Sequence, residues 1–161
     1  MGKRSRDKGK CAEREVVQIL RAAWVAERSS ARVLHADYTD PANDEHSRLI
    51  RRGLQGQGNA SGEMVPDVVA PGLWCEVKRR MRVHPGDWIA GMAQAARAAA
   101  RGRLGQVPCC WYRSDHGPWW VAIAAQDFCE MAGADWPFDD ALVHVAGEDF
   151  GRCWASWERG L

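Results

Sequence analysis

Two acidic residues and a lysine stand close together in the sequence, on either side of a short turn. Asp67 precedes Pro71-Gly72, and Glu76 and Lys78 follow it, two residues apart. Carboxylate oxygens are ligands that Mg²⁺ prefers, and the ion often binds through one or two carboxylates together with a phosphate. A nearby lysine could position or deprotonate an attacking water, or stabilise charge that develops on the phosphate. These residue types therefore predict metal-assisted chemistry on a phosphate ester.

The segments around Pro71-Gly72 have the pattern of a β-hairpin. Residues 65–70 and 73–79 are short runs rich in apolar residues, and Pro followed by Gly is typical of a turn. With these two residues as the turn, Ala70 pairs with Leu73. Pro-Gly favours a type II turn, which matches strand twist less well than primed turns, so a longer loop or a bulge would shift this register.

The same register predicts that Asp67 faces Glu76. Opposed side chains have Cβ atoms about 5 Å apart, and like charges at that spacing destabilise a sheet unless something neutralises them. Lys78 shares a face with Glu76 because side chains alternate along a strand. Val77 points to the other face, although its carbonyl oxygen could also ligate a cation. The alternative is coincidence, because Pro-Asp and Glu-x-Lys are each common in charged proteins.

Residues 11–26 have the periodicity of an amphipathic helix, with one acid in the apolar stripe. The stripe consists of Glu13, Val16, Val17, Leu20, Ala23 and Trp24. An inward carboxylate needs a partner, because burying it alone is costly, so Glu13 is a candidate third ligand, directly or through water. Alternatively, Glu13 complements the dipole at the start of the helix. Glu15 points elsewhere and is expected at the surface.

Positive charge is concentrated in the first part of the chain. Residues 1–113 carry 20 Lys/Arg and 12 Asp/Glu, whereas residues 114–161 carry 2 and 9, so a net charge of +1 conceals this asymmetry. Several basic clusters could converge into one phosphate-binding surface, or each could be an ordinary solvated face. The residues we expect to contact DNA are Lys3, Arg4, Arg6, Lys8, Lys10, Arg51, Arg52, Arg79 and Arg80.

The remaining pattern predicts an α/β protein with a mixed central sheet flanked by helices. We expect strands at 32–38, 107–112 and 119–124, a strand or helix end at 48–52, a loop at 53–63, and helices at 86–103 and 126–132. A length of 161 residues suits one domain, 1–161, with a Trp-rich acidic extension at about 126–161. Trp119 and Trp120 are expected to be core or dimer contacts rather than base-stacking platforms.

The cysteines and the N-terminus bear on the cellular setting. None of the six cysteines has C-x-x-C spacing, so zinc is poorly supported and buried free thiols in a reducing compartment are expected. No apolar run could cross a bilayer, and Met1 to Lys10 lacks the apolar segment of a secretory signal. We therefore expect a cytoplasmic protein without membrane contact.

The chain resembles the PD-(D/E)XK nuclease superfamily, and the archaeal and phage types of Holliday junction resolvase in particular. Pro66-Asp67 and Glu76-Val77-Lys78 match the signature, and the stretch from Lys8 to Glu15 (Lys-Gly-Lys-Cys-Ala-Glu-Arg-Glu) is similar to the resolvases' start. Ser61-Gly62 before Val65-Pro66-Asp67 is similar to a further segment. The match covers about residues 8–125, and residues 38–47 resemble an insertion.

The resemblance implies a restriction-endonuclease-like fold and a homodimer that cuts branched DNA with Mg²⁺, for which Mn²⁺ substitutes. It implies that Glu13, Asp67 and Glu76 are metal-site acids and that Lys78 is the catalytic lysine. Ser61 would help to place the scissile phosphate, and Gln94 matches a helix glutamine of many members. Two alternatives stay open: a nicking, end-processing or restriction-type nuclease, and a nucleic-acid-binding module without catalysis.

Overall fold

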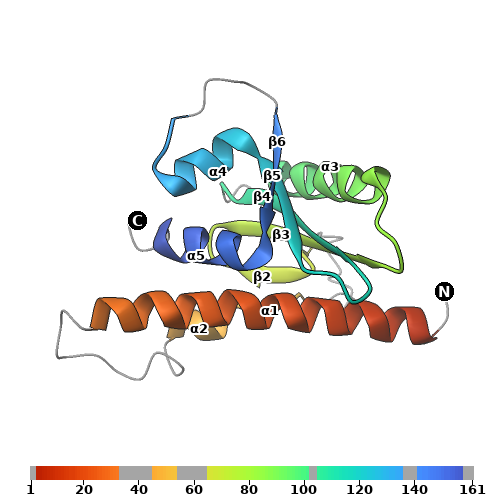
Figure 1. Ribbon diagram of the computed structural model, residues 1–161, viewed down its shortest axis with the longest axis horizontal. Coiled ribbons are helices and arrows are strands. Elements are labelled where there is room, and N and C mark those ends of the chain that lie inside the picture. The colour runs from red at the N-terminus through yellow and green to blue at the C-terminus, as the bar shows by residue number, and fades with distance from the viewer. Residues whose placement is uncertain (1–2, 33–44, 54–64, 102–104, 136–140, 158–161) are drawn as a thin grey trace.

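The structure is a computed structural model, and it describes the backbone of residues 3–32, 45–53, 65–101, 105–135 and 141–157. Side chains are described for residues 7–27 and 47–53 and for the last three of those ranges. The elements are α1 (Lys3–Arg32), α2 (Glu45–Leu49), β1 (Arg51–Arg52), β2 (Val68–Ala70), β3 (Leu73–Arg80), α3 (Pro85–Arg101), β4 (Val107–Ser114), β5 (Trp120–Ala124), α4 (Ala125–Ala132), β6 (Leu142–Ala146) and α5 (Gly147–Trp157) (Figure 1).

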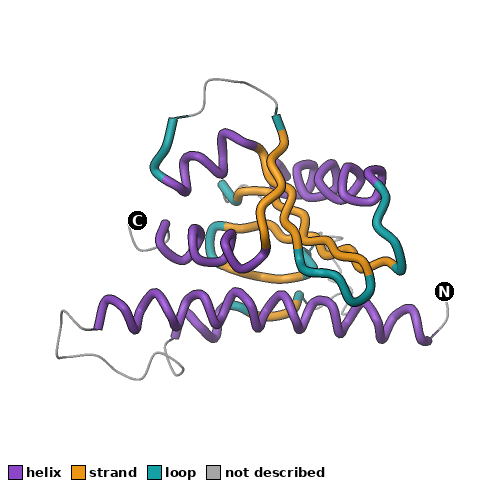
Figure 2. Tube along the Cα trace, in the orientation of Figure 1, coloured by secondary structure: helices purple, strands orange, loops and turns teal. Residues whose placement is uncertain are grey.

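The described strands form one mixed sheet in the order β1-β2-β3-β4-β5-β6. Strands β3 and β4 are parallel and are connected through α3, whereas every other neighbouring pair is antiparallel. Figure 2 shows the strands in the middle of the molecule with helices around them. The prediction of an α/β fold with a mixed sheet between helices is confirmed, and its restriction-endonuclease-like character stays a prediction.

The hairpin forms in the predicted register. Ala70 pairs with Leu73, Val69 with Trp74 and Val68 with Cys75. Gly72 has φ 66°, a left-handed conformation that glycine adopts without steric cost. A type II turn requires this conformation at its third residue, which is the position of Gly72 between Ala70 and Leu73. The turn therefore places the two segments that carry Asp67 and Glu76 side by side.

Different helices cover the two faces of the sheet. Helix α1 crosses one face, and α3 lies on the opposite face (Figure 1). Strand residues alternate accordingly: Cys75, Cys109 and Trp111 join the core with α1, whereas Cys110 packs against Met92 of α3. Glu76 and Lys78 belong to the α3 face, since Glu76 pairs with Cys110 and directly paired side chains share a face.

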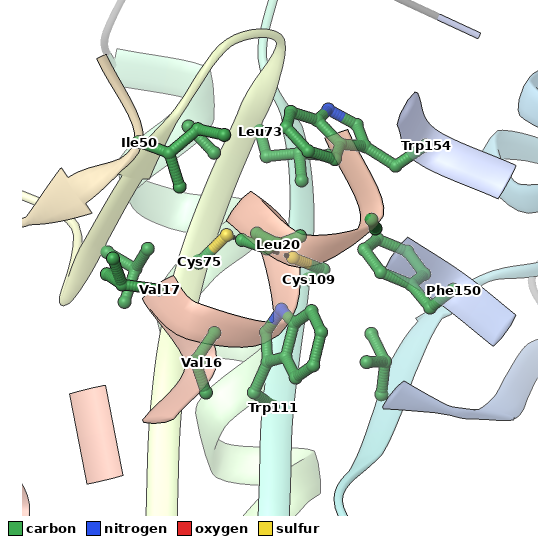
Figure 3. Close-up of a cluster of buried hydrophobic side chains, with 14 of the residues drawn as sticks. Val16, Val17, Leu20, Ile50, Leu73, Cys75, Cys109, Trp111, Phe150 and Trp154 are labelled. Carbon is green, nitrogen blue, oxygen red and sulfur yellow. Dashed lines mark hydrogen bonds between the residues drawn. The ribbon is translucent and has the colours of Figure 1, made fainter. Parts of the chain in front are cut away.

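The main core lies between the sheet, α1 and α5. Figure 3 shows Trp111 and Leu20 at its centre, with Phe150 and Trp154 of α5 beside them. All four residues are fully buried, with an exposed fraction of 0%. The apolar stripe predicted for residues 11–26 therefore contacts the sheet, and this contact fixes the orientation of α1.

The acidic C-terminal part of the chain, for which the sequence predicted no element beyond residue 132, supplies β6 and α5. Its signals are short but present: Leu142, Val143 and Val145 form an apolar run interrupted only by His144, and Phe150 and Trp154 are four residues apart. Trp154 packs against Trp24 of α1 with ring centroids 5.7 Å apart. This segment completes the sheet and the core.

Other element boundaries differ modestly from expectation. Helix α1 is longer than the predicted 11–26, and α3 ends at Arg101 rather than at residue 103. The segment 48–52 is both a helix end and a strand, split between α2 and β1. The predicted strand 32–38 begins in the last residue of α1 and otherwise lies outside the described residues, as does most of the loop 53–63. None of the described helices combines the length and apolarity needed to span a membrane.

Candidate active site

Asp67 lies at a bend immediately before β2, and its carboxylate is held by the neighbouring strand. Strand pairing ends at Val68, and the Asp67 N–H donates to the Cys75 carbonyl at 2.9 Å. The Val77 N–H, two residues beyond the last paired residue Cys75, donates to Asp67 Oδ2 at 2.8 Å. The carboxylate therefore takes the place of a backbone acceptor on β2, and Asp67 is 8% exposed.

Gly53 fixes the backbone on the other side of Asp67. Its N–H donates to the Asp67 carbonyl at 2.9 Å. A Cβ at this position would stand 1.8 Å from the Pro66 carbonyl oxygen, so any side chain would push the Pro66-Asp67 segment away. The glycine thus permits a close backbone approach that positions the acid.

Glu76 is a buried acid beside another acid. It is 2% exposed, and burial followed by the negative charge of Asp67 raises the pKa of Glu76 to about 7. A hydrogen bond between the Glu76 and Asp67 carboxyl groups acts in the same direction, and Lys78 offsets the shift only in part. Two carboxyl groups this close cannot both ionise freely, so the pair attracts a proton or a cation.

Lys78 places its ammonium group beside this acid pair. Nζ lies 3.2 Å from Glu76 Oε2 and 3.2 Å from Gln94 Oε1, so α3 orients the lysine from above. The lysine stem runs under the helix at Gly91, where a Cβ would meet Cys110 Sγ at 2.4 Å and Lys78 Cε at 3.3 Å. The structure thus brings Asp67, Glu76, Lys78 and Gln94 together, and we call these four residues the carboxylate site.

Glu13 faces inward as predicted, but its carboxylate has a cation of its own. Arg52 of β1 contacts Glu13 Oε2 through Nη2 at 2.5 Å and through Nε at 2.6 Å. Burial nevertheless raises the pKa of Glu13, and the charge of Asp67 contributes to that rise. The charge of Asp67 therefore reaches Glu13, while the Arg52 guanidinium neutralises the Glu13 carboxylate.

Across the described residues, no three or more Asp, Glu, His or Cys side chains gather in a group that could hold a metal ion. The predicted three-acid metal site is thus not formed by Glu13, Asp67 and Glu76 in this structure. The physical reason is the Arg52 ion pair, which gives Glu13 a partner other than a cation. Asp67 and Glu76, with the Val77 carbonyl as a further candidate, are the oxygen donors that remain.

A second charged cluster lies on the opposite face of β3, and we call it the ion-pair network. Its members are Lys8, Glu15, Arg79, Arg113 and Asp115. Glu15 Oε1 contacts Arg79 at 3.2 Å, and its Oε2 contacts Arg113 at 2.7 Å and accepts a hydrogen bond from Trp119 Nε1 at 3.2 Å. Glu15 is thus partly exposed, with 34% of its side chain accessible, and it also has ion-pair partners that the sequence did not predict.

The residues expected to contact DNA occupy several environments. Lys8 and Arg79 both bind Asp115, and Arg79 has an 18% exposed side chain, so it is largely occupied within the protein. Arg80 is 53% exposed and contacts Asp87 at 3.2 Å. Lys10 and Arg51 are exposed, and Arg52 holds Glu13. The side chains of Lys3, Arg4 and Arg6, and the whole of Ser61, lie outside what the structure describes.

Part of the basic charge does converge at one end of the sheet. Lys8 comes from the start of α1, Arg79 and Arg80 from the end of β3, and Arg113 from the end of β4. Asp115, which binds both Lys8 and Arg79, joins these segments. Lys8, Arg79 and Arg113 lie on the face opposite Lys78 and are paired with Glu15 and Asp115, whereas Arg80 shares the face of Lys78.

Comparisons of the chain with protein-family models, with curated proteins and with solved structures find no match. The case for a function therefore rests on the geometry and charge of the site itself.

Proposed function

We propose that this protein is a Mg²⁺-dependent DNA endonuclease that hydrolyses phosphodiester bonds at the carboxylate site. One observation carries the proposal: the buried Glu76 carboxyl group lies close enough to Asp67 for that acid to raise its pKa, with the Lys78 ammonium 3.2 Å from Glu76 Oε2. A fold gains no stability from placing two acids together in its interior, because desolvation and repulsion both oppose their ionisation. Perturbed acids beside a specific charged partner are typical of functional sites.

The donor set at this site fits Mg²⁺. Asp67 and Glu76 offer carboxylate oxygens, and the N–H and C=O of a strand residue point to the same side, so the Val77 carbonyl faces Asp67 as its N–H does. Magnesium is typically bound through one or two carboxylates, with waters and a substrate phosphate completing its shell. Bound there, the ion would neutralise the acid pair and the charge on the phosphate.

The chain's own groups would contribute positioning and charge. Lys78 places a fixed ammonium where negative charge develops on the phosphate, and a preorganised charge in a site shielded from water acts strongly. Gln94 accepts a hydrogen bond from that ammonium and limits its rotation. The Val77 N–H fixes the Asp67 carboxylate, so the acid keeps its orientation before substrate arrives.

Surrounding charge favours a polyanionic substrate over a small phosphate ester. Arg80, which is 53% exposed at the end of β3, lies two residues beyond Lys78 and on the same face, and phosphate contacts dominate DNA affinity. The resemblance to resolvases makes the four-way junction the first substrate to test, and it makes a homodimer the expected assembly, because a junction carries two strands to be cut.

The experiment is a cleavage panel with labelled four-way junction, flap and linear duplex, each with Mg²⁺, with Mn²⁺ and with EDTA. Cleavage that needs the metal supports an endonuclease, and preference for the junction supports a resolvase. Asp67→Asn and Lys78→Ala are each expected to lower the rate at least about 100-fold while binding largely survives. Binding without cleavage in either metal would overturn the enzymatic proposal and leave a nucleic-acid-binding module.

Metal binding can be measured apart from activity. Mn²⁺ is expected to raise the melting temperature of the wild-type protein, because a ligand that binds only the folded state stabilises it. Asp67→Asn should remove most of this rise, whereas Glu15→Gln in the ion-pair network should keep it. Equal Mn²⁺ stabilisation of both variants would place the metal elsewhere. DNA affinity should also fall steeply with salt, and a flat response would contradict phosphate contacts.

A further inference from the structure

A row of side chains runs across the sheet from the carboxylate site. Lys78 pairs with Tyr112 of β4, and Tyr112 pairs with Trp120 of β5. Directly paired residues point to the same face, so all three lie on the side of the sheet that carries α3. Neighbouring strands are about 4.8 Å apart, which puts Trp120 about 10 Å from Lys78 along the row.

At the end of this row lies an open cavity of about 380 Å³ with aromatic walls. Its aromatic lining consists of Trp88, Tyr112, Trp120 and His84. Ser114 also lines it, so the cavity combines flat rings with a hydroxyl group. Ser114 Oγ accepts a hydrogen bond from the Val83 N–H at 3.2 Å, which fixes the segment that leads into α3.

The inner wall of this cavity is preorganised. The Trp88 ring meets the His144 ring edge-on, with centroids 4.4 Å apart. Tyr112 Oη and His144 Nδ1 share a hydrogen bond of 2.7 Å, and Trp88 and Tyr112 have centroids 6.3 Å apart. These contacts hold the rings in place. A ligand could therefore bind without first ordering these side chains.

Trp120 differs from its chain neighbour Trp119. Trp119 is 7% exposed and belongs to the core, as expected, whereas Trp120 is 40% exposed on the opposite face. Two exposed arginines border the cavity: Arg80, the last residue of β3, pairs with the lining residue Ser114, and Arg82 directly precedes the lining residues Val83 and His84. An exposed indole in a hollow with a basic rim suits a ligand that is both aromatic and anionic.

We propose that this aromatic cavity binds an unpaired nucleobase of the DNA strand whose phosphate lies at Lys78, with the base stacked on Trp120. The proposal rests on the proposed function, since it takes DNA as the substrate, and it makes the substrate class DNA with unpaired nucleotides beside the cut. Stacking on aromatic rings recognises any base, because every base has a π-face. Exposed cations at the rim supply the phosphate contacts that stacking needs.

The charged rim favours this occupant over a second copy of the chain. An interface between copies would bury the exposed Arg80 and Arg82 along with Trp120, whereas phosphates neutralise those cations where they stand. The location beside Lys78 argues the same way, since substrate must approach this part of the sheet for the proposed reaction to occur.

The test measures binding in EDTA, so that it does not depend on cleavage. A fluorescent blunt duplex is compared with the same duplex bearing a short single-stranded arm, by anisotropy, for wild type, Trp120→Ala and Trp120→Phe. Trp120→Ala should weaken binding of the armed duplex about 10-fold and leave the blunt duplex within about twofold. Trp120→Phe should restore most of the loss. The control is Leu142→Ala, which removes a 39% exposed apolar side chain from the same sheet face and should change neither affinity.

The outcomes separate this inference from the proposed function. Metal-dependent cleavage with no effect of Trp120→Ala on the armed duplex would overturn the stacking site and leave the endonuclease intact. A Trp120-dependent affinity for unpaired DNA in a protein that never cleaves would support the stacking site and overturn the enzyme. A loss of dimer mass by light scattering in Trp120→Ala, with DNA affinity unchanged, would place a second copy on the indole and overturn the inference.

Discussion

The carboxylate site and the ion-pair network occupy opposite faces of one strand, and their charges are arranged in opposite ways. In the network, the acids Glu15 and Asp115 lie between the cations Lys8, Arg79 and Arg113, so each acid contacts two cations. The hydrogen bonds from Lys8 and Arg79 hold the pKa of Asp115 below its usual value. Both acids of the network are thus neutralised within the protein.

In the carboxylate site, the buried acid Glu76 lies beside a second acid, Asp67, and beside the ammonium group of Lys78. Glu76 and Asp67 contact each other, and the pKa of Glu76 rises to about 7 even with Lys78 at 3.2 Å. Each acid of the network has two cations beside it, whereas Glu76 has one cation and one acid. Alternation along β3 separates them, because Glu76 and Lys78 point toward α3 while Arg79 points toward α1. The charge around Glu76 therefore distinguishes the carboxylate site from the ion-pair network, and it is the reason that a function is proposed at only one of the two clusters.

The largest expected contrast comes from removing one negative charge in each cluster. Glu76→Gln should lower the cleavage rate at least about 100-fold, because it removes a metal-site acid. Glu15→Gln, the matched control, should lower stability by about 1 kcal/mol, since its ion pairs are partly exposed, and keep the rate within about twofold. Steady-state cleavage and urea unfolding of both variants check this. An equal loss of cleavage rate in Glu76→Gln and Glu15→Gln would contradict the proposed difference between the carboxylate site and the ion-pair network.

The next largest expected effect is the change with pH in the free energy of unfolding of the metal-free protein. The folded pKa of Glu76 is about 7, above the ordinary value of 4.5. The stability that its protonated form provides is therefore fully present below about pH 4.5 and is lost as pH rises through 7. Linkage puts this loss on the order of 3 kcal/mol. Urea unfolding in EDTA at pH 5.5 and 8.5 should show Glu76→Gln gaining on wild type at the higher pH. A constant difference would contradict the acid pair.

Two glycines of α3 test whether the helix positions Lys78. Gly91→Ala would place a Cβ 2.4 Å from Cys110 Sγ and 3.3 Å from Lys78 Cε, so we expect a loss of about 2 kcal/mol in stability and about 10-fold in rate. Gly86→Ala meets no atom within 4 Å and should cost neither. Thermal unfolding and cleavage compare the two. Similar behaviour of both variants would show that the helix does not press on the lysine.

The smallest effect concerns the orientation of the ammonium. Gln94→Ala removes the 3.2 Å hydrogen bond to Lys78 Nζ, worth about 1 kcal/mol, so the turnover number should fall about fivefold with little change in stability. Gln94→Glu keeps an acceptor oxygen and should retain more activity. Single-turnover rates separate the two variants, and full activity of Gln94→Ala would remove the glutamine from the site.

The hairpin and its acids were predictable because they are local. Pro71-Gly72 is strong turn chemistry, and the pairing of Ala70 with Leu73 follows from it directly. Period-2 alternation then puts Glu76 and Lys78 on one face, and the helical stripe turns Glu13 inward. In each case, the information lies within a few residues of chain, where backbone geometry limits the choices.

The partner of each charge was not predictable, because it depends on contacts between distant segments. Arg52 reaches Glu13 across 39 positions, and Glu15 and Trp119 meet across 104. The same holds for β6 and α5, whose weak local patterns become meaningful only where Trp154 meets Trp24. The bend at Asp67 was not predictable either. It is fixed by backbone hydrogen bonds to two separate segments, from Gly53 N–H to the Asp67 carbonyl and from Asp67 N–H to the Cys75 carbonyl.

The sequence by itself determined the mixed α/β architecture, the hairpin register and the nearness of two acids to a lysine, since periodicity and turn chemistry act over short stretches. Only the tertiary structure decided which charges are neutralised and which are not. The reason is that an ionisable group responds to everything within several ångströms, whatever its distance along the chain.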